Sequence, residues 1–498
     1  MAVSKISGAA LADLLGRWPA REGPLYRLLA DRIATLADSG ELPAGLRLPP
    51  ERELAAALSV SRNTAAAAYQ LLRDEGLAET RQGAGTSIAP HRTTPAAVHR
   101  ANGYFAGLLS SAQVAVDLTL SAVDCAPQVA AALDEPATVL GAAQRRAITG
   151  ATGYHPLGLP ALRDAAASHF TTRHQLPTTA GQVLVTTGGQ QAIDLLMRAV
   201  VIPGQPVVVE DPTFPGALDA LHRAGARPLG LPAAHGTDVD RLARLLRTHR
   251  PALVYLIPTH HNPTGRVMPL AQRRQLAGLA AEHPATLFVD DLTLAELSLA
   301  RPGQAAGAEA GPPPLAALAP GLPNIVTVGS LSKIYWGGLR TGWIRAAPPL
   351  ISRLAAAKAA SDLGSNAYGQ AVAAALLAGW HDAIVAWRAG QLRTRRDTLH
   401  AALRAQLPGW SWTLPPGGLT LWVRLPDGAD SGVLAQAALR LGVGVIPGRL
   451  LSAADAGRDW VRIAYTQPPA QLRAAVPLLA QAWRSARPQV AAARRQAG

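Results

Sequence analysis

From about residue 115 to residue 485, short apolar runs alternate with longer stretches rich in Ala, Leu and Arg. The runs include VLVTTG, PVVVED, ALVYLI, TLFVDD and NIVTVG, and several are bounded by Gly or Pro. Short bounded runs of this kind are typical of buried parallel strands, and the stretches between them have helical composition. The alternation therefore predicts an α/β body, doubly wound around a parallel sheet.

The domain organisation follows from shifts in composition. Two later runs, LTLWVRL and DWVRIAY, indicate a smaller α+β subdomain at the C-terminal end of the body. At 498 residues the chain also exceeds one typical domain. We expect a head over residues 1–88 with its core at 24–88, a Pro-, Thr- and Gly-containing linker over 89–114, the body over 115–485 and an arginine-rich tail over 486–498.

The head is predicted to contain several helices followed by a hairpin. Apolar residues recur at helical spacing from Leu25 to Leu36. A short helix is predicted from about Pro50 to a break at residues 59–60, and a second one from its N-cap, Ser61, to Gly76. The runs LAET and TSI flank the turn RQGAG. This order predicts an all-α winged helix-turn-helix domain with a two-stranded wing.

Composition excludes several classes of protein. The apolar runs are too short to cross a membrane, and the N-terminal segment has no clear cleavage site for secretion. The single cysteine, Cys125, excludes an internal disulfide framework and a cysteine-based zinc site. We therefore expect a cytoplasmic protein without membrane partners, and we predict no metal ligands.

The second predicted helix of the head begins with residues suited to reading DNA. The net charge of +14 is compatible with a polyanionic partner, but local arrangement must decide. A recognition helix places its N-terminal end in the major groove of double-stranded DNA. The residues there that offer hydrogen bonds to bases and phosphates are Ser61, Arg62, Asn63 and Thr64.

The head resembles the GntR winged-helix family. The family pattern LPxERELAxxLxVSRxTxxxAYxxLxxEGL is matched over roughly 65 residues of this sequence. The resemblance implies binding to an operator in double-stranded DNA. It implies DNA contacts by Arg52, Arg62, Thr64 and Gly83, with Ser61 and Asn63 in neighbouring positions.

Lysine is scarce in this chain. Of its 47 Lys and Arg residues, only Lys5, Lys333 and Lys358 are lysines. A primary amine can form a Schiff base, which a guanidinium cannot, so a retained lysine needs a chemical reason. In GSLSKIYWGGLRTGW, Lys333 is the candidate for an aldimine with pyridoxal 5′-phosphate (PLP), with Ser330 and Arg340 near enough in sequence to bind the phosphate.

Three further segments fit the same cofactor. The turn of VLVTTGGQQ opens a helix whose N-terminus suits a phosphate. Asp291 in LFVDD would keep the pyridine nitrogen of the cofactor protonated. Asn262 in THHNPTG would bind the phenolic oxygen of the cofactor. The side chain of Phe214 would stack on the cofactor ring. The candidates in the turn are Gly188, Gly189 and Gln190. Singly, these residues also fit an ordinary turn, a helix cap or a core position, so the argument depends on their coincidence.

The body resembles the class I aminotransferases of fold type I over roughly 370 residues, and its fusion to a GntR head resembles the MocR (GabR-like) regulators. The resemblance implies a fold-type I PLP-dependent transferase fold and a head-to-tail, domain-swapped homodimer. It also implies that Tyr154 reaches the phosphate in the partner subunit and that Arg462 clamps a substrate or effector α-carboxylate.

Two features of the body depart from the enzyme pattern. Leu294 stands where these enzymes usually have a tyrosine, three residues after the pyridine-binding aspartate, so one hydrogen bond to the phenolic oxygen is missing. The stacking residue is Phe214 where Tyr or Trp is common. Asp290, next to Asp291, also leaves the aspartate assignment open by one position.

Two functions remain open on this basis. The first is a PLP-dependent transcription regulator in which PLP, or an amino compound bound to it, shifts the body between states and changes operator binding. The alternative is a catalytically active class I aminotransferase that carries a DNA-binding module. The residue Leu294 favours the regulator, whereas the retained Lys333, Asp291 and Arg462 support the enzyme.

Overall fold

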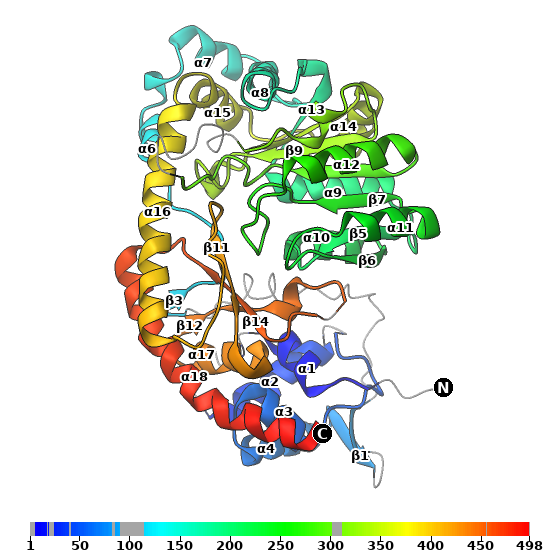
Figure 1. The fold of residues 1–498 in the computed structure, drawn as a ribbon, viewed down its shortest axis with the longest axis vertical. Helices are drawn as coiled ribbons and strands as arrows, with labels where there is room; N and C mark the ends of the chain where they lie inside the picture. The colour runs from blue at the N-terminus through cyan, green and yellow to red at the C-terminus, as the bar shows by residue number, and fades with distance from the viewer. Residues whose placement is uncertain are drawn as a thin grey trace.

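The computed structural model describes residues 5–16, 18, 24–38, 41–81, 85–89, 114–300, 311–454 and 456–497. It has three parts: an N-terminal head, a large α/β domain and a small subdomain that lies between them (Figure 1). Residues 90–113, which include nearly all of the predicted linker, lie outside the described residues.

The head has the predicted helices and wing. Its elements are α1 (Gly8–Leu15), α2 (Leu25–Asp38), α3 (Glu51–Leu58), α4 (Arg62–Asp74), β1 (Ala78–Arg81) and β2 (Gly85–Ile88). Ser61 caps α4 by accepting a hydrogen bond from the amide of Thr64, and Ser59 takes the left-handed conformation that ends α3. Ala68 and Leu72 are buried in the head core, as expected. Helix α1 was not predicted.

The large domain is built on a seven-stranded sheet of order β4-β10-β9-β8-β7-β5-β6. Its strands are β4 (Val183–Thr186), β5 (Pro206–Asp211), β6 (Arg227–Pro232), β7 (Leu253–Leu256), β8 (Leu287–Asp291), β9 (Ile325–Ser330) and β10 (Gly342–Arg345). The sheet is mixed, which corrects the expectation of a parallel one, because β10 is antiparallel to both β4 and β9. The short connection from β9 to β10 leaves no room for a parallel crossover.

Both faces of this sheet are buried. Alternate residues of one strand enter different apolar cores: Val208 lies in one, and Val207 and Val209 lie in the other. Helices α9 (Gly189–Val200), α10 (Pro215–Arg223) and α14 (Pro348–Asp362) supply the second core. Helices that contribute to the first are α6 (Pro127–Asp134), α8 (Pro160–Arg173), α11 (Val239–His249), α12 (Leu270–Glu282), α13 (Leu315–Leu318) and α15 (Ala367–Gly379). The short helix α7 (Ala142–Thr149) precedes α8.

The small subdomain has two small sheets, β11-β14-β13 and β12-β3. Strand β3, from the start of the body, pairs in parallel with β12, so both ends of the body meet here. The elements are β3 (Val116–Asp117), α16 (His381–Gln406), β11 (Thr420–Arg424), α17 (Ser431–Arg440), β12 (Val443–Gly444), β13 (Ile446–Pro447), β14 (Trp460–Ala464) and α18 (Pro469–Ala497). Residues 486–497, expected as a tail, continue α18. Among the described residues, no helix is both long and apolar enough to span a bilayer.

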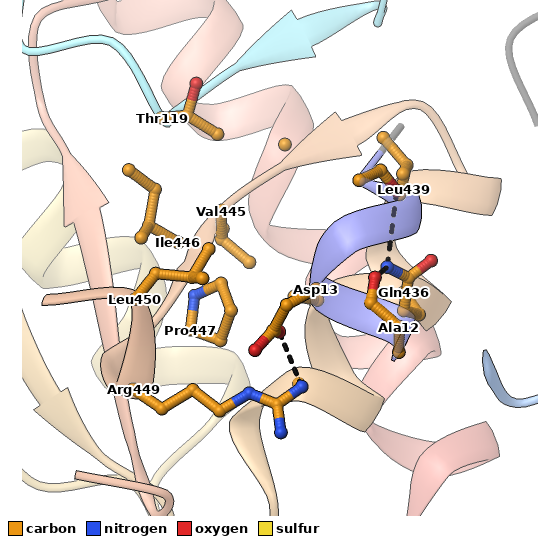
Figure 2. A pocket seen from close by; sticks show the side chains of 14 residues that line it. Ala12, Asp13, Thr119, Gln436, Leu439, Val445, Ile446, Pro447, Arg449 and Leu450 are labelled. Carbon is orange, nitrogen blue, oxygen red and sulfur yellow. Dashed lines mark hydrogen bonds and ion pairs between the residues drawn. The ribbon is translucent and has the colours of Figure 1, made fainter. Parts of the chain in front are cut away.

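The head packs on the small subdomain of its own chain. Helix α1 lies beside α17 and the β13 segment (Figure 2). Arg449, which is 7% exposed, pairs with Asp13 of α1 at 2.5 Å, and it also donates to the carbonyl oxygen of Ala9. The Gln436 amide donates to the carbonyl oxygen of Ala12 at 3.4 Å. A small cavity of about 80 Å³ remains between these groups.

We expect Arg449→Met to loosen the head. Loss of one partner of a fully buried ion pair typically costs about 3–5 kcal/mol, and the cost here should be smaller because the Asp13 side chain is 20% exposed. Backbone amides of α1 should therefore exchange their hydrogens at least roughly tenfold faster, which mass spectrometry of the full-length protein measures. Arg473→Met, on an exposed position of α18, is the matched control. Equal protection of the α1 amides against hydrogen exchange in both variants would contradict this role of Arg449.

Candidate functional site

The predicted cofactor residues follow strands that run in one direction. Strands β5, β7, β8 and β9 are parallel, and β4 has the same direction as β9 because both are antiparallel to β10. Gly188, Phe214 and Lys333 follow β4, β5 and β9, and Asp291 ends β8. Since the carboxyl ends of such strands meet at one edge of the sheet, these residues gather there.

A cavity at this edge joins four of the predicted residues. Its volume is about 40 Å³. The residues that line it are Ser121, Phe214, Ile257, Asn262, Asp291, Thr293, Leu294, Lys333, Leu419 and Thr420. Lys333, Asp291, Asn262 and Phe214 therefore share one cavity, as the sequence analysis expected. Ile257, Thr293 and the residues from positions 121, 419 and 420 were not predicted.

The amine of Lys333 is held in place within the cavity. Its Nζ donates a hydrogen bond of 2.8 Å to the carbonyl oxygen of Ser121. Burial lowers the pKa of Lys333 from 10.5 to about 8, and the positive charges of Arg462 and Arg340 act in the same direction, against Asp291. Near neutral pH, the fraction of this side chain that is the neutral amine required for a Schiff base is therefore far larger than for an ordinary lysine.

The two neighbouring aspartates point to opposite faces of the sheet. Asp291 lines the cavity and accepts hydrogen bonds from the Tyr255 hydroxyl at 2.5 Å and the Thr293 amide at 2.8 Å. Burial raises the pKa of Asp291, and these hydrogen bonds and the charge of Lys333 oppose that shift. Asp290 instead accepts from the amide of Leu315 at 2.7 Å. The geometry thus assigns the cavity position to Asp291.

Arg462 lies beside the cavity wall and is fully buried. Its Nη1 donates to Asn262 Oδ1 at 3.1 Å, and its Nη2 donates to the carbonyl oxygen of Thr119 at 2.7 Å. A buried guanidinium next to Lys333 is suited to a carboxylate, which it can bind with two parallel hydrogen bonds. The predicted Arg462 and Asn262 are therefore in direct contact.

The turn after β4, formed by Gly188 and Gly189 with the Arg340 guanidinium beside it, is suited to an anion and is called the cup below. Gly188 has φ of +100°, and a Cβ there would lie 3.4 Å from the Arg340 guanidinium. A Cβ on Gly189 would meet Thr293 at 2.9 Å, so both positions favour glycine. The N-terminus of α9, which begins at Gly189, supplies amide donors, and Arg340 donates to the carbonyl oxygen of Thr187.

Two other predicted phosphate ligands differ in placement. Ser330 Oγ donates to Ser332 Oγ at 3.1 Å, so it stands with its neighbour beside the cup. The side chain of Gln190 turns away, because its Nε2 donates to the carbonyl oxygen of Gly216 at 2.9 Å. Only the backbone amide of Gln190, in the first turn of α9, points to the cup.

The residues fit PLP. The glycine turn and the N-terminus of α9 would hold the phosphate, the buried carboxylate of Asp291 would pair with the ring nitrogen, and Lys333 would supply the amine. When bound, PLP supplies an aldehyde carbon and an electron-withdrawing ring. Leu294 lines the same cavity with an apolar side chain, so it offers no hydrogen bond to the ring.

Arg388, which was not predicted from the sequence, holds the backbone that follows Lys333. Arg388 is fully buried and donates to the carbonyl oxygens of Ile334 at 2.9 Å and Tyr335 at 3.0 Å, directly after Lys333. It also pairs with Asp124 at 3.0 Å. The contact joins positions 264 residues apart, and a helical arginine in the sequence gives no signal of it.

The predicted DNA-reading residues lie on the surface of the head. Arg52, Ser61, Arg62 and Asn63 are exposed, and Thr64 is half-buried. Arg62 lies 3.8 Å from Glu51, at the start of α3. Gly83, in the wing turn, lies outside the described residues. The side chain of Tyr154 in the body is 68% exposed, so its own subunit does not enclose it.

Comparison with known proteins assigns the body and the head to two families. Residues 120–479 match the family of class I and II aminotransferases, and residues 25–88 match the bacterial regulatory proteins of the gntR family. The chain is 27% identical over 476 residues to YisV, an uncharacterized HTH-type transcriptional regulator of Bacillus subtilis, covering 91% of this chain and 95% of YisV. It is 33% identical over 288 residues to 2-aminoadipate transaminase of Thermus thermophilus, covering 57% of this chain and 70% of the transaminase.

Solved structures support the fold of the body. LysN, the α-aminoadipate aminotransferase of Thermus thermophilus, crystallised with N-(5′-phosphopyridoxyl)-L-leucine, is similar with a TM-score of 0.66 and 28% identity. The likeness covers 77% of this chain and 95% of LysN. The aminotransferase match spans more than half of the sequence, and the gntR match covers the head. The chain therefore belongs to the class I and II aminotransferase family, as a PLP-dependent transcription regulator of the MocR type with a gntR-family winged-helix head.

Proposed function

We propose that the body senses PLP, or an amino compound that reacts with bound PLP, through Lys333 and reports this state to the DNA-binding head. The observation that carries the proposal is that the half-buried Lys333 shares one cavity with Asp291, Asn262 and Phe214, in a chain whose head matches the gntR family. A ligand changes DNA affinity only if it favours one state of the protein, so the site must be linked to the head.

Such a link runs through the small subdomain. Arg462 donates to the Thr119 carbonyl oxygen, and within the sheet Arg462 is paired with Ile446 of β13. Thr119 and Ile446 both line the cavity beneath α1, next to Arg449 (Figure 2). An effector carboxylate that moved Arg462 would therefore act on residues that line the same cavity as Ala12 and Asp13 of α1. This continuity supports coupling, and a difference in DNA affinity is its test.

An active aminotransferase is the second candidate. The retained Lys333, Asp291 and Arg462 favour it, and the 2-aminoadipate transaminase is a relative. Leu294 in the cavity wall and the full-length likeness to YisV favour the regulator. Sustained turnover of an amino donor with a keto acid would establish the enzyme, whereas a single half-reaction per subunit fits a sensor.

The assembly we propose is a homodimer in the cytoplasm. Tyr154 is exposed in the single chain, as a residue that serves a partner's phosphate site would be. Paired heads also suit the two half-sites of an operator. In a domain-swapped, head-to-tail dimer, the surface around Arg449 would receive the partner's head in place of the chain's own. The residues that we propose to contact operator DNA are Arg52, Ser61, Arg62, Asn63, Thr64 and Gly83.

The sensing proposal predicts a specific loss in Lys333→Ala. DNA ligands selected by the wild-type protein from a random duplex pool provide the probe. We expect PLP and candidate amino compounds to change wild-type affinity by about 5- to 150-fold, a typical coupling, and to leave Lys333→Ala unchanged. Lys5→Ala, at an exposed position, is the lysine control, and borohydride reduction with peptide mapping locates the attached PLP. A variant lacking Lys333 that still responded to ligand would rule the proposal out.

The lowered pKa of Lys333 predicts the pH dependence of PLP attachment. Attack requires the neutral amine, whose fraction grows as pH rises through the pKa. The attachment rate of cofactor-free protein, followed by the visible absorbance of bound PLP, should rise with pH with a midpoint at about 8. Arg462→Gln removes a positive charge and should move the midpoint to higher pH. A wild-type midpoint near 10, as for an ordinary lysine, would contradict the stated environment.

Arg62→Ala tests the head. If Arg62 contacts a phosphate, the variant should bind all duplex sequences more weakly, and the slope of log K against log salt should fall by about 1. Fluorescence anisotropy over a salt series measures both quantities. Arg73→Ala, at the far end of the same helix, is the control. An unchanged slope in Arg62→Ala would exclude a phosphate contact.

A further inference from the structure

Two histidines and a glutamate converge in the large domain, away from the PLP cavity. His169 lies on α8, Glu296 follows β8, and His381 begins α16. The Nε2 atoms of His169 and His381 lie 3.3 Å and 3.1 Å from the same carboxylate oxygen, Glu296 Oε1. One potential ligand atom from each of the three residues lies within 4.8 Å of the others. None of these residues has a role in the site described above.

The three side chains are largely withdrawn from solvent and held in place. The exposed fractions are 7% for His169, 6% for His381 and 18% for Glu296. Tyr335 Oη forms a hydrogen bond of 3.1 Å with His381 Nδ1, so the outer nitrogen of this ring is engaged and Nε2 faces the cluster. An outer hydrogen bond of this kind is the usual way in which proteins orient a metal-binding imidazole.

The spacing matches a metal coordination sphere. Tetrahedral zinc with bonds of about 2.0–2.1 Å to nitrogen and oxygen has ligand atoms roughly 3.4 Å apart. Two of the three separations, 3.3 Å and 3.1 Å, are close to this value, and the third lies within 4.8 Å. Two imidazoles and one carboxylate form a complete three-ligand set, with a fourth position left for water or another small ligand.

A cavity provides room for that fourth ligand. It has a volume of about 250 Å³ and is lined by both histidines, together with Ser168, Thr172 and Asp382. The two histidines thus border a space large enough for several waters, whereas Glu296 is not part of its lining. At its rim, Arg173 forms an ion pair with Asp382, so the lining is polar and suits a hydrated ion.

We propose that His169, Glu296 and His381 bind one divalent transition-metal ion, with zinc as the occupant that the ligand set favours. Imidazole nitrogen and carboxylate oxygen are established zinc ligands, and zinc accepts three protein ligands and one open position. The ion would fasten α8, the segment after β8 and the start of α16 to one another. Tyr335, which supports His381, lies two residues after Lys333.

The sequence alone gave no sign of this site, since its three residues are far apart in the chain. Without a metal, the same geometry is a hydrogen-bond network in which one carboxylate oxygen accepts from the Nε2–H groups of two imidazoles. The two cases differ in a measurable way, because only the metal site gains stability from added zinc.

The test uses the full-length, PLP-loaded protein without an affinity tag. The protein is stripped with a chelator, dialysed against micromolar zinc and measured for bound zinc by plasma mass spectrometry and for its unfolding temperature. We expect one zinc per chain and a higher unfolding temperature in zinc. Glu296→Gln and His169→Gln should bind zinc at least roughly tenfold more weakly and lose the temperature shift.

His400→Gln is the matched control, because His400 lies on α16 against Trp412, outside the cluster. It should bind zinc as the wild type does. The visible absorbance of bound PLP reports that each variant is folded. Wild-type protein that retains no zinc, or Glu296→Gln that retains as much as the wild type, would overturn the proposal and leave the hydrogen-bond network.

Discussion

The arrangement of the site depends on the sheet of the large domain, which is buried on both faces. Burial on both sides fixes the register of β4, β5, β7, β8 and β9, because a slip by one residue would exchange the two apolar cores. Because these strands run in one direction, a glycine turn, an aromatic ring, a carboxylate and an amine lie at their carboxyl ends, along one edge of the sheet. The lowered pKa of Lys333 follows from this enclosure.

The small subdomain is the second determinant, because it touches both functional parts. Its strand β14 carries Arg462 to the wall of the cofactor cavity, and the segment after β13 carries Arg449 to α1 of the head. Both positions belong to one antiparallel sheet or directly follow it. A sheet that contacts the cofactor cavity on one side and the head on the other offers a continuous path for the proposed coupling.

Sequence reasoning succeeded where a residue type has few alternative uses. The β-branched runs predicted five buried strands, and the scarcity of lysine singled out Lys333. It failed for β10, whose short run, GWIR, gives no clear strand pattern and which returns antiparallel after a short loop. It also left Asp290 and Asp291 unresolved, because adjacent strand residues face opposite sides and only the packing shows which side holds the cavity. Arg388 and Ser121 act through contacts between distant segments, which no local pattern reports.

The central claim is that the state of the cofactor site changes DNA binding through the contact between Arg449 and the head. The most direct measurement compares the DNA affinity of PLP-loaded and PLP-free protein, in the wild type and in Arg449→Met. The account predicts that both proteins attach PLP at Lys333 and that only the wild type changes its DNA affinity. An Arg449→Met protein that responded to PLP as strongly as the wild type would contradict the account.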